Sequence, residues 1–418
     1  MTKTAVGADA DLRPRVHRPV RLGLALALGA ALWIGPFMAF NAVLLPARIE
    51  QIDPTGKVGV IALLAIAGSV VAMLSNILFG ALSDITRSRF GRRTPWLLIG
   101  SLGASASLIA VMNADTVPLI VLTWCAFQLF LNIVASPLLA IIADRVPAHA
   151  RGTYSAVYGV GSLVGITGAQ IVAAGFVTAP EQGMIVFAVV MVLAGPVVIL
   201  LAPERSNRDE PRQRLSGRAL VSTFAFPLRN ARDFYFALGG KFGFMLGTYT
   251  IAGYQLYILT DYIGVSTAEA GGVIAGMAAI QLVTSAVFGA ISGPISDKLG
   301  RRKAIVIAAM LLVAVGSVLP FFVAEVWAMY AYAILAGVGM GVFISVDQAL
   351  NTDVLPSEEN SAKDLGILNM ANTGGQIAGP VVTSAIVAGT GTFGPAFIVA
   401  AAILVGGAGL ILPIKKVR

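Results

Sequence analysis

A short basic motif occurs twice in this chain, about half the sequence apart. Gly80-Ala-Leu-Ser-Asp84 is followed by Gly91-Arg92-Arg93, and Gly293-Pro-Ile-Ser-Asp297 is followed by Gly300-Arg301-Arg302-Lys303. The sequence around both copies is almost continuously apolar. Internal repeats of helical bundles give transporters a site that opens to either side in turn. The repeat therefore predicts a membrane protein built from two similar halves.

The apolar content of the chain agrees with this prediction. Hydrophobic residues make up 57% of the 418 residues and charged residues only 12%, whereas a soluble chain carries roughly 25% charged residues. Hydropathy predicts twelve segments, each near the roughly 20 residues that cross a bilayer. They cover residues 22–46, 58–83, 94–113, 116–143, 152–177, 183–203, 234–262, 268–296, 302–324, 328–352, 362–388 and 392–412. The predicted fold is an all-α membrane protein with twelve transmembrane helices in two pseudo-symmetric six-helix bundles.

One long polar stretch, residues 204–233, divides the chain in the middle. A stretch of this kind is typical of a linker between two domains. We therefore expect a tail over residues 1–21, an N-terminal six-helix bundle over 22–203, a linker over 204–233, a C-terminal six-helix bundle over 234–412 and a second tail over 413–418.

The positions of the basic residues predict the topology. Of the 29 Lys and Arg residues, 26 fall in the two tails and in the loops on the same side of the membrane, whereas only Arg48 and Lys57 fall on the other side. Loops rich in Lys and Arg stay in the cytoplasm. Both termini and the linker are thus expected to be cytoplasmic, in a multi-pass protein of the plasma membrane. The formal charge of +8 is then a topology signal, and nucleic acid is not an expected partner.

Motifs for enzymatic chemistry are missing from the sequence. It contains no Walker A sequence, no HExxH, no nucleophile elbow and no cofactor fingerprint, and Cys125 is its only cysteine. We therefore expect neither an enzyme nor a metal or cofactor site. The N-terminal residues show no cleavable signal peptide, so the first span is expected to act as its own signal. The expected partners are a small-molecule substrate, a coupling ion and membrane lipid, and the expected state is a monomer.

The loop after the second span resembles the signature loop of the major facilitator superfamily. Its longer form, Ser83-Asp84 through Gly91-Arg92-Arg93-Thr-Pro95-Trp96, is similar to that of glycoside-pentoside-hexuronide cation symporters and sucrose-type transporters. The resemblance implies gating roles for Asp84, Arg92 and Arg93, and for their counterparts Asp297, Arg301 and Arg302. Arg145, at the end of span 4, is a possible partner for Asp84. The alternative is that these charges only anchor the topology.

Two charged residues lie deep inside predicted spans, where charge is costly and therefore points to function. Lys241 lies in span 7 and Asp347 in span 10, both on the order of 10 Å from the cytoplasmic surface at about 1.5 Å per residue. We predict that they form a pair, with Asp347 as the group that carries the proton. The alternative is that Lys241 extends to the membrane surface and that Asp347 makes only local hydrogen bonds.

Polar and aromatic residues recur on single helical faces of five spans, at spacings of three, four or seven. In facilitator folds, spans 1, 4, 7 and 10 line the cavity. Amides mixed with aromatic rings suit a neutral polyhydroxylated ligand, although some of these residues are expected to be packing contacts between helices. The candidates for substrate binding are Trp33, Phe37, Asn41, Trp124, Gln128, Asn132, Thr248, Tyr254, Gln255, Phe343, Asn372 and Gln376.

Together these features predict a secondary active transporter that works by alternating access, with proton-coupled uptake of a sugar or glycoside-like neutral solute. Sodium remains a second possible coupling ion. Proton-driven efflux of drugs and transport of organic anions are the alternatives. The Gly379-Pro380 pair lies in span 11 and not in span 5, which disfavours the efflux alternative, and the opposite charges of Lys241 and Asp347 disfavour an anion.

Overall fold

The computed structural model describes residues 19–147, 150–209, 227, 231–356 and 361–415. Within these residues the secondary structure is helical, and no strand is found. Helices satisfy every backbone polar group internally, as a span in lipid requires. The predictions for the N-terminal tail, for most of the linker and for the last three residues fall outside the described part of the chain.

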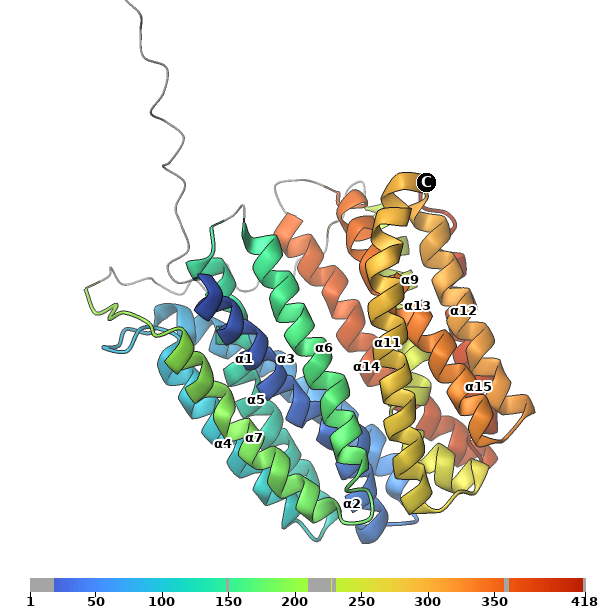
Figure 1. Ribbon diagram of the computed structural model, residues 1–418. Coiled ribbons are helices and arrows are strands. Elements are labelled where there is room, and N and C mark those ends of the chain that lie inside the picture. Colours follow the sequence, from blue (N-terminus) through green and yellow to red (C-terminus); the bar gives the residue numbers. More distant parts are fainter. Residues whose placement is uncertain (1–18, 148–149, 210–226, 228–230, 357–360, 416–418) are drawn as a thin grey trace, which may run out of the picture.

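The N-terminal half forms one bundle, shown in blue to green in Figure 1. Helix α1 continues through one π-helical turn, η1, into the short helix α2, and these three act as a single span. The elements are α1 (Pro19–Ala39), η1 (Phe40–Leu44), α2 (Leu45–Ile52), α3 (Lys57–Ile85), α4 (Thr94–Met112), α5 (Val117–Arg145), α6 (Arg151–Ala174) and α7 (Pro180–Leu201).

The C-terminal half repeats this order, in yellow to red (Figure 1). Its elements are α9 (Arg232–Ala252), α10 (Gln255–Tyr257), η3 (Ile258–Ile263), α11 (Thr267–Leu299), α12 (Arg302–Phe322), α13 (Val326–Asp353), α14 (Ser361–Thr390) and α15 (Gly394–Ile411). In the described residues, ten helices are long and apolar enough to cross a membrane. The long helices α9 and α14, which are less apolar than most of these ten, complete the predicted set of twelve.

Packing within the two bundles follows the same plan. Helix α1 packs on α6 and α7, and α9 packs in the same way on α14 and α15. Small residues allow the closest approaches: a Cβ on Gly161 would lie 2.1 Å from the carbonyl oxygen of Ala27, and one on Gly341 would lie 2.3 Å from that of Ser285. Backbones in contact at glycines are typical of helix packing in membranes. The bundles are therefore pseudo-symmetric, as the sequence repeat predicted.

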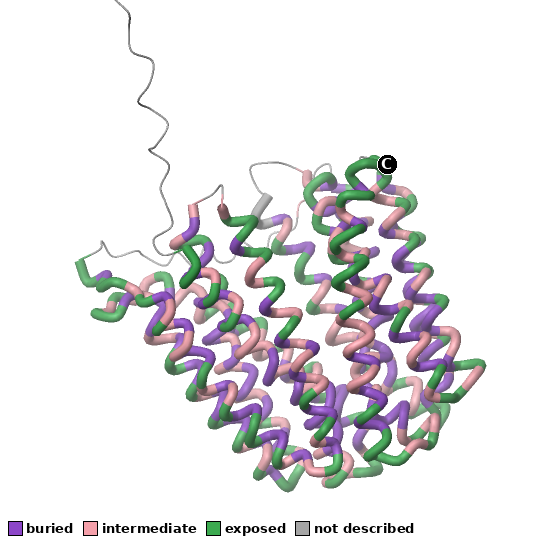
Figure 2. The backbone as a smooth tube through the Cα atoms, viewed as in Figure 1, coloured by how far each residue is buried: buried purple, intermediate pink, exposed green. Residues whose placement is uncertain are grey.

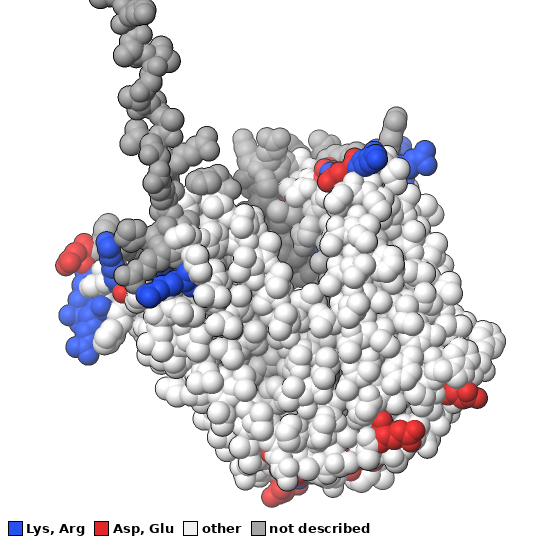
Figure 3. Space-filling model, viewed as in Figure 1, with Lys and Arg blue, Asp and Glu red and all other residues white. Residues whose placement is uncertain are grey.

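Exposed residues lie along the outer faces of the bundles (Figure 2), and many large apolar residues are exposed. Leu122 is 66% exposed and Leu200 77% exposed, which suits a surface that faces lipid. Charged residues gather at the two ends of the molecule in Figure 3, and the visible Lys and Arg residues lie at one of them. We call the end that carries Arg92 and Arg302 the basic end, and the other the opposite end.

Candidate functional site

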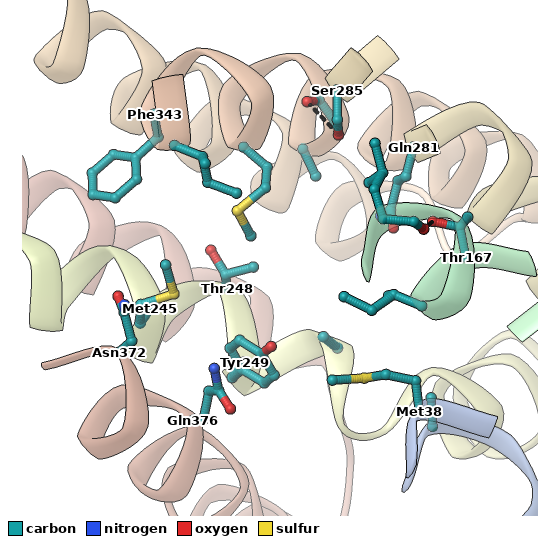
Figure 4. Close-up of a pocket in the computed structure, with 18 of the residues that line it drawn as sticks. Met38, Thr167, Met245, Thr248, Tyr249, Gln281, Ser285, Phe343, Asn372 and Gln376 are labelled. Atoms are coloured by element: carbon teal, nitrogen blue, oxygen red, sulfur yellow. Dashed lines mark hydrogen bonds between the residues drawn. The ribbon is translucent and has the colours of Figure 1, made fainter. Parts of the chain in front are cut away.

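A cavity of about 440 Å³ lies between the two bundles. It is lined from α1, η1 and α6 on one side and from α9, α10, α11, α13 and α14 on the other, and Figure 4 shows part of this lining. Seven carboxamides face it: Asn41, Gln170, Gln255, Gln281, Gln348, Asn372 and Gln376. Hydroxyl groups and the apolar side chains of Met38, Met245, Met340 and Phe343 complete the lining. This mixture suits a ligand that carries hydrogen-bonding groups on an apolar frame.

Lys241 and Asp347 are the charged residues of the lining among those described, and they pair with each other. The Lys241 Nζ donates a hydrogen bond to the Asp347 Oδ2 over 2.8 Å, and the Asn351 Nδ2 donates to the same oxygen over 2.7 Å. Both charged side chains are almost fully buried, at 2% and 5% exposure. Beside the pair, the rings of Phe244 and Phe343 stack with centroids 3.7 Å apart. The contact expected between spans 7 and 10 is therefore present, and its part in coupling remains a prediction.

Nine of the twelve candidate substrate residues line the cavity or a smaller chamber beside it. Asn41, Thr248, Gln255, Phe343, Asn372 and Gln376 line the main cavity. Phe37, Trp124 and Gln128 line the smaller chamber, which has a volume of about 70 Å³ and also contacts Asn41 and Gln376.

Three candidates have other neighbours. The Trp33 Nε1 donates to the hydroxyl of Tyr158 on α6 over 3.1 Å. The Asn132 side chain donates to the Gln128 carbonyl and accepts from Asn76. Tyr254 is a link between the bundles, because its hydroxyl donates to the carbonyl oxygens of Val58 and Pro380.

Polar residues of α6 and α11 also line the cavity, and the sequence analysis did not select them. Thr167 and Gln170 come from α6, and Gln281 and Ser285 come from α11; Figure 4 shows Thr167 and Gln281 across one side of the cavity. Their spacings of three and four residues match those of the selected stripes. A search extended to spans 5 and 8 would have found them.

The opposite end is closed by polar contacts between the bundles around Lys57. This residue begins α3, and its Nζ lies 2.6 Å from Glu50 of its own bundle and 2.6 Å from Asp261 of the other. The ammonium also lies 4.6 Å from the centroid of the Tyr257 ring. The Tyr257 hydroxyl in turn donates to the Pro46 carbonyl across the bundle interface. We call this set of contacts the gate at Lys57, on the prediction that it opens during transport. The sequence analysis treated Lys57 only as an exception to the charge distribution.

Removal of the Lys57 charge should open this gate. Lys57→Met breaks the contact with Asp261 between the bundles, whereas Glu50→Gln leaves that contact in place and serves as the matched control. A cysteine at Ala42, which lines the cavity, placed in a Cys125→Ser background, reports access for a membrane-impermeant maleimide added outside intact cells. We expect labelling about tenfold faster in Lys57→Met, because a bias of about 1.4 kcal/mol changes a two-state ratio tenfold. Equal rates in the Lys57→Met and unchanged proteins would rule out this gate.

At the basic end, each copy of the repeated motif forms ion pairs within its own bundle. Arg93 contacts Asp84 at 2.6 Å and Asp144 at 2.9 Å, and it also hydrogen-bonds Ser83. In the second copy, Arg302 contacts Asp297 at 3.0 Å and Asp353 at 2.5 Å. Each arginine therefore joins the loop that follows the second helix of the bundle to the end of the fourth. None of these ion pairs joins one bundle to the other in this structure.

Arg145, which the sequence analysis gave as a possible partner for Asp84, has other partners in this structure. Arg145 donates to the carbonyl oxygens of Ala202 and Pro203, which directly precede the linker, while Arg92 contacts Asp144. The reason is the loop after α3. Gly91 adopts a φ of 91°, which only glycine adopts readily. The chain turns back at this residue, and Arg93 then contacts Asp84. Arg301 is exposed.

The first copy of the motif is the more buried, since the side chain of Arg93 is 3% exposed and that of Arg302 is 29% exposed. Burial disfavours the charged form of Arg93, but hydrogen bonds and charge interactions with Asp144 and then Asp84 outweigh it, so the pKa of Arg93 lies above its ordinary value. Glu204 of the linker accepts from the backbone N–H groups of Arg93 and Thr94, both over 2.8 Å. The linker is thus attached to the start of α4.

Comparison with known proteins identifies the family. The model of the Major Facilitator Superfamily matches residues 22–276 and 236–417. The gentisate transporter of Corynebacterium glutamicum is 32% identical over 107 residues, which cover 26% of this chain and 23% of that protein. Solved structures share the fold at low identity. The nucleoside transporter NupG has a TM-score of 0.74 at 14% identity, covering 94% of this chain and 99% of its own. A D-xylose-proton symporter has a TM-score of 0.69 at 14% identity, covering 95% and 98%.

Proposed function

The chain belongs to the Major Facilitator Superfamily, a family of membrane transporters and not of enzymes, and from this premise we propose that it carries a small neutral polar solute by proton-coupled uptake. Alternating access between the bundles moves the central cavity from one face of the membrane to the other. On the distribution of Lys and Arg, the basic end faces the cytoplasm. The contacts around Lys57 then lie at the outer face of the membrane, between the two bundles.

The observation that carries this proposal is the buried Lys241–Asp347 pair in the wall of the amide-rich cavity. With the pair intact the cavity lining is neutral, so a charged solute gains no uncompensated partner there. Amides both donate and accept hydrogen bonds, as hydroxyl groups do. A solute with several hydroxyl or carbonyl groups therefore fits the lining better than an ion does.

Coupling follows from the same pair. The Oδ2 atom of Asp347 accepts hydrogen bonds from both Lys241 and Asn351. A proton on Asp347 removes the attraction and leaves Lys241 as an uncompensated buried charge, which is unfavourable. The loaded and unloaded carriers thus differ in the energy of this pair, and such a difference is what shifts a two-state equilibrium. Proton binding outside and release inside would drive the solute inward.

Organic anion transport is the second candidate, because Lys241 is available to a carboxylate once Asp347 is protonated. The gentisate transporter to which this chain is similar is named for an aromatic acid. In this alternative, one proton and one monoanion enter together, and transport moves no net charge. The neutral candidate with one proton moves one positive charge for each solute molecule.

Uptake into proteoliposomes tests the proposal. The purified chain is reconstituted and given radiolabelled D-xylose, uridine, sucrose or gentisate, with an inward proton gradient, with a sodium gradient or with neither. We expect accumulation of at least one of the three neutral solutes with the proton gradient, and stimulation of this uptake by a potential that is negative inside. Uptake of gentisate alone, insensitive to the potential, would favour the second candidate. Accumulation that needs sodium and not protons would contradict the coupling.

A further inference from the structure

The small chamber beside the main cavity is a separate feature of the site. We call it the side chamber: the space of about 70 Å³ between α1, α3 and α5 that is lined by Phe37, Ser69, Trp124 and Gln128. Asn41, Tyr249 and Gln376 line both this chamber and the main cavity. The two spaces are therefore neighbours, and one solute can extend from one into the other.

Polar groups in the side chamber have no partners within the described residues. Gln128 is only 7% exposed and Trp124 1%, yet neither the Gln128 amide nor the Trp124 indole N–H makes a hydrogen bond to another described residue. By contrast, the other indole N–H groups of this bundle, those of Trp33 and Trp96, donate to hydroxyl groups of Tyr158 and Thr86. Neither side chain is among the fully enclosed polar atoms that lack a partner, and both residues line the chamber, so their polar groups are open to it. A ligand hydroxyl that hydrogen-bonds to such a group contributes about 0.5–1.5 kcal/mol.

The lining also limits the chemistry of such a ligand. None of the described residues around the side chamber is charged, so a carboxylate or ammonium group would enter it without a counter-charge, which is strongly unfavourable. The rings of Phe37 and Trp124 are stacked with centroids 6.2 Å apart and present apolar walls. At about 10–15 Å³ for each water-sized group, the space holds roughly five of them. It fits one edge of a small ring rather than a whole sugar.

We propose that the side chamber is a subsite for an uncharged, hydroxyl-bearing edge of the transported solute, such as two neighbouring hydroxyl groups of a sugar ring. The inference rests on the proposed transport function and adds to it the orientation and the chemical class of the solute. The Trp124 N–H donates to one hydroxyl oxygen, and the Gln128 amide donates to or accepts from the next. The rest of the solute lies in the main cavity, where Phe343 and the Lys241–Asp347 pair are found.

The fluorescence of Trp124 tests the assignment. The chain has four tryptophans, so Trp33→Phe, Trp96→Phe and Trp327→Phe leave Trp124 as the one emitter. D-xylose, uridine and sucrose serve as neutral probes, and D-gluconate serves as a hydroxyl-rich anion. We expect a saturable change in emission with at least one neutral probe and none with D-gluconate. Gln128→Leu should raise the dissociation constant at least about tenfold.

The matched control is Thr123→Val on the same helix, because the Thr123 hydroxyl donates only to carbonyl oxygens of its own helix. It should leave the dissociation constant unchanged. In the chain with all four tryptophans, Gln128→Leu should raise the KM for uptake of the same probe by a similar factor, which keeps the test valid if the single-tryptophan variant fails to fold.

The outcomes separate the two proposals. A probe that is transported with the same KM by the unchanged and Gln128→Leu proteins overturns the subsite and leaves the transport function standing. A saturable response to D-gluconate alone also overturns the subsite. Absence of both uptake and emission change with every probe overturns the subsite and the proposed function together.

Discussion

Asp347→Asn should abolish accumulation of solute against its gradient while counterflow exchange continues. The substitution keeps the shape of the side chain but removes the group that binds and releases a proton, so the coupling step is lost and the passive movement of the loaded carrier remains. Asp347 is the one carboxylate of the cavity lining among the described residues. We expect proton-driven accumulation to fall to the background of empty liposomes.

The matched control is Asp115→Asn, which makes the same chemical change at a side chain that is 85% exposed. That variant should accumulate solute as the unchanged protein does. Persistence of uphill uptake in Asp347→Asn would assign the coupling to a different group.

The Lys241–Asp347 pair should also appear as a strong coupling in protein stability. Lys241→Met and Asp347→Asn each leave the other charge buried without its partner, which costs about 3–5 kcal/mol. The double variant buries no charge and should recover most of the loss. The free energies of unfolding of the four proteins in detergent, from denaturant titration of the helical signal, give the interaction energy of the cycle. Strictly additive losses would mean that the two side chains do not interact in the folded protein.

The fold and the central pair were predictable because both depend on local pattern. Apolar length predicted the twelve spans, and the repeated motif predicted the two similar halves. The depth of Lys241 and Asp347 along their helices placed them at one level. It was harder to predict which residues each helical face contacts. Trp33 and Trp124 belong to similar stripes, yet Trp33 donates to Tyr158 and only Trp124 lines a chamber. Tertiary packing decides which residue each side chain contacts, and the spacing of residues along one helix contains no information about that packing.

The contacts of the gate at Lys57 and of the loop after α3 could not be predicted from the sequence for the same reason. Lys57 and Asp261 are far apart in sequence, and only the closed arrangement of the bundles brings them within 2.6 Å. In the loop after α3, where Gly91 has a positive φ, Arg93 contacts Asp84, whereas Arg145 bonds elsewhere. A single sequence shows that a basic loop is present, but the pairing within it depends on where the chain turns.

Proton movement that accompanies solute movement tests the central claim most directly. Proteoliposomes that contain the reconstituted chain and an internal pH-sensitive dye are given an inward gradient of the transported solute, with no initial pH difference and with the membrane potential clamped by potassium and valinomycin. The account predicts that the lumen acidifies when the solute is added to the unchanged protein and that it does not acidify with Asp347→Asn. Solute entry without acidification in the unchanged protein, or equal acidification in the two proteins, would contradict it.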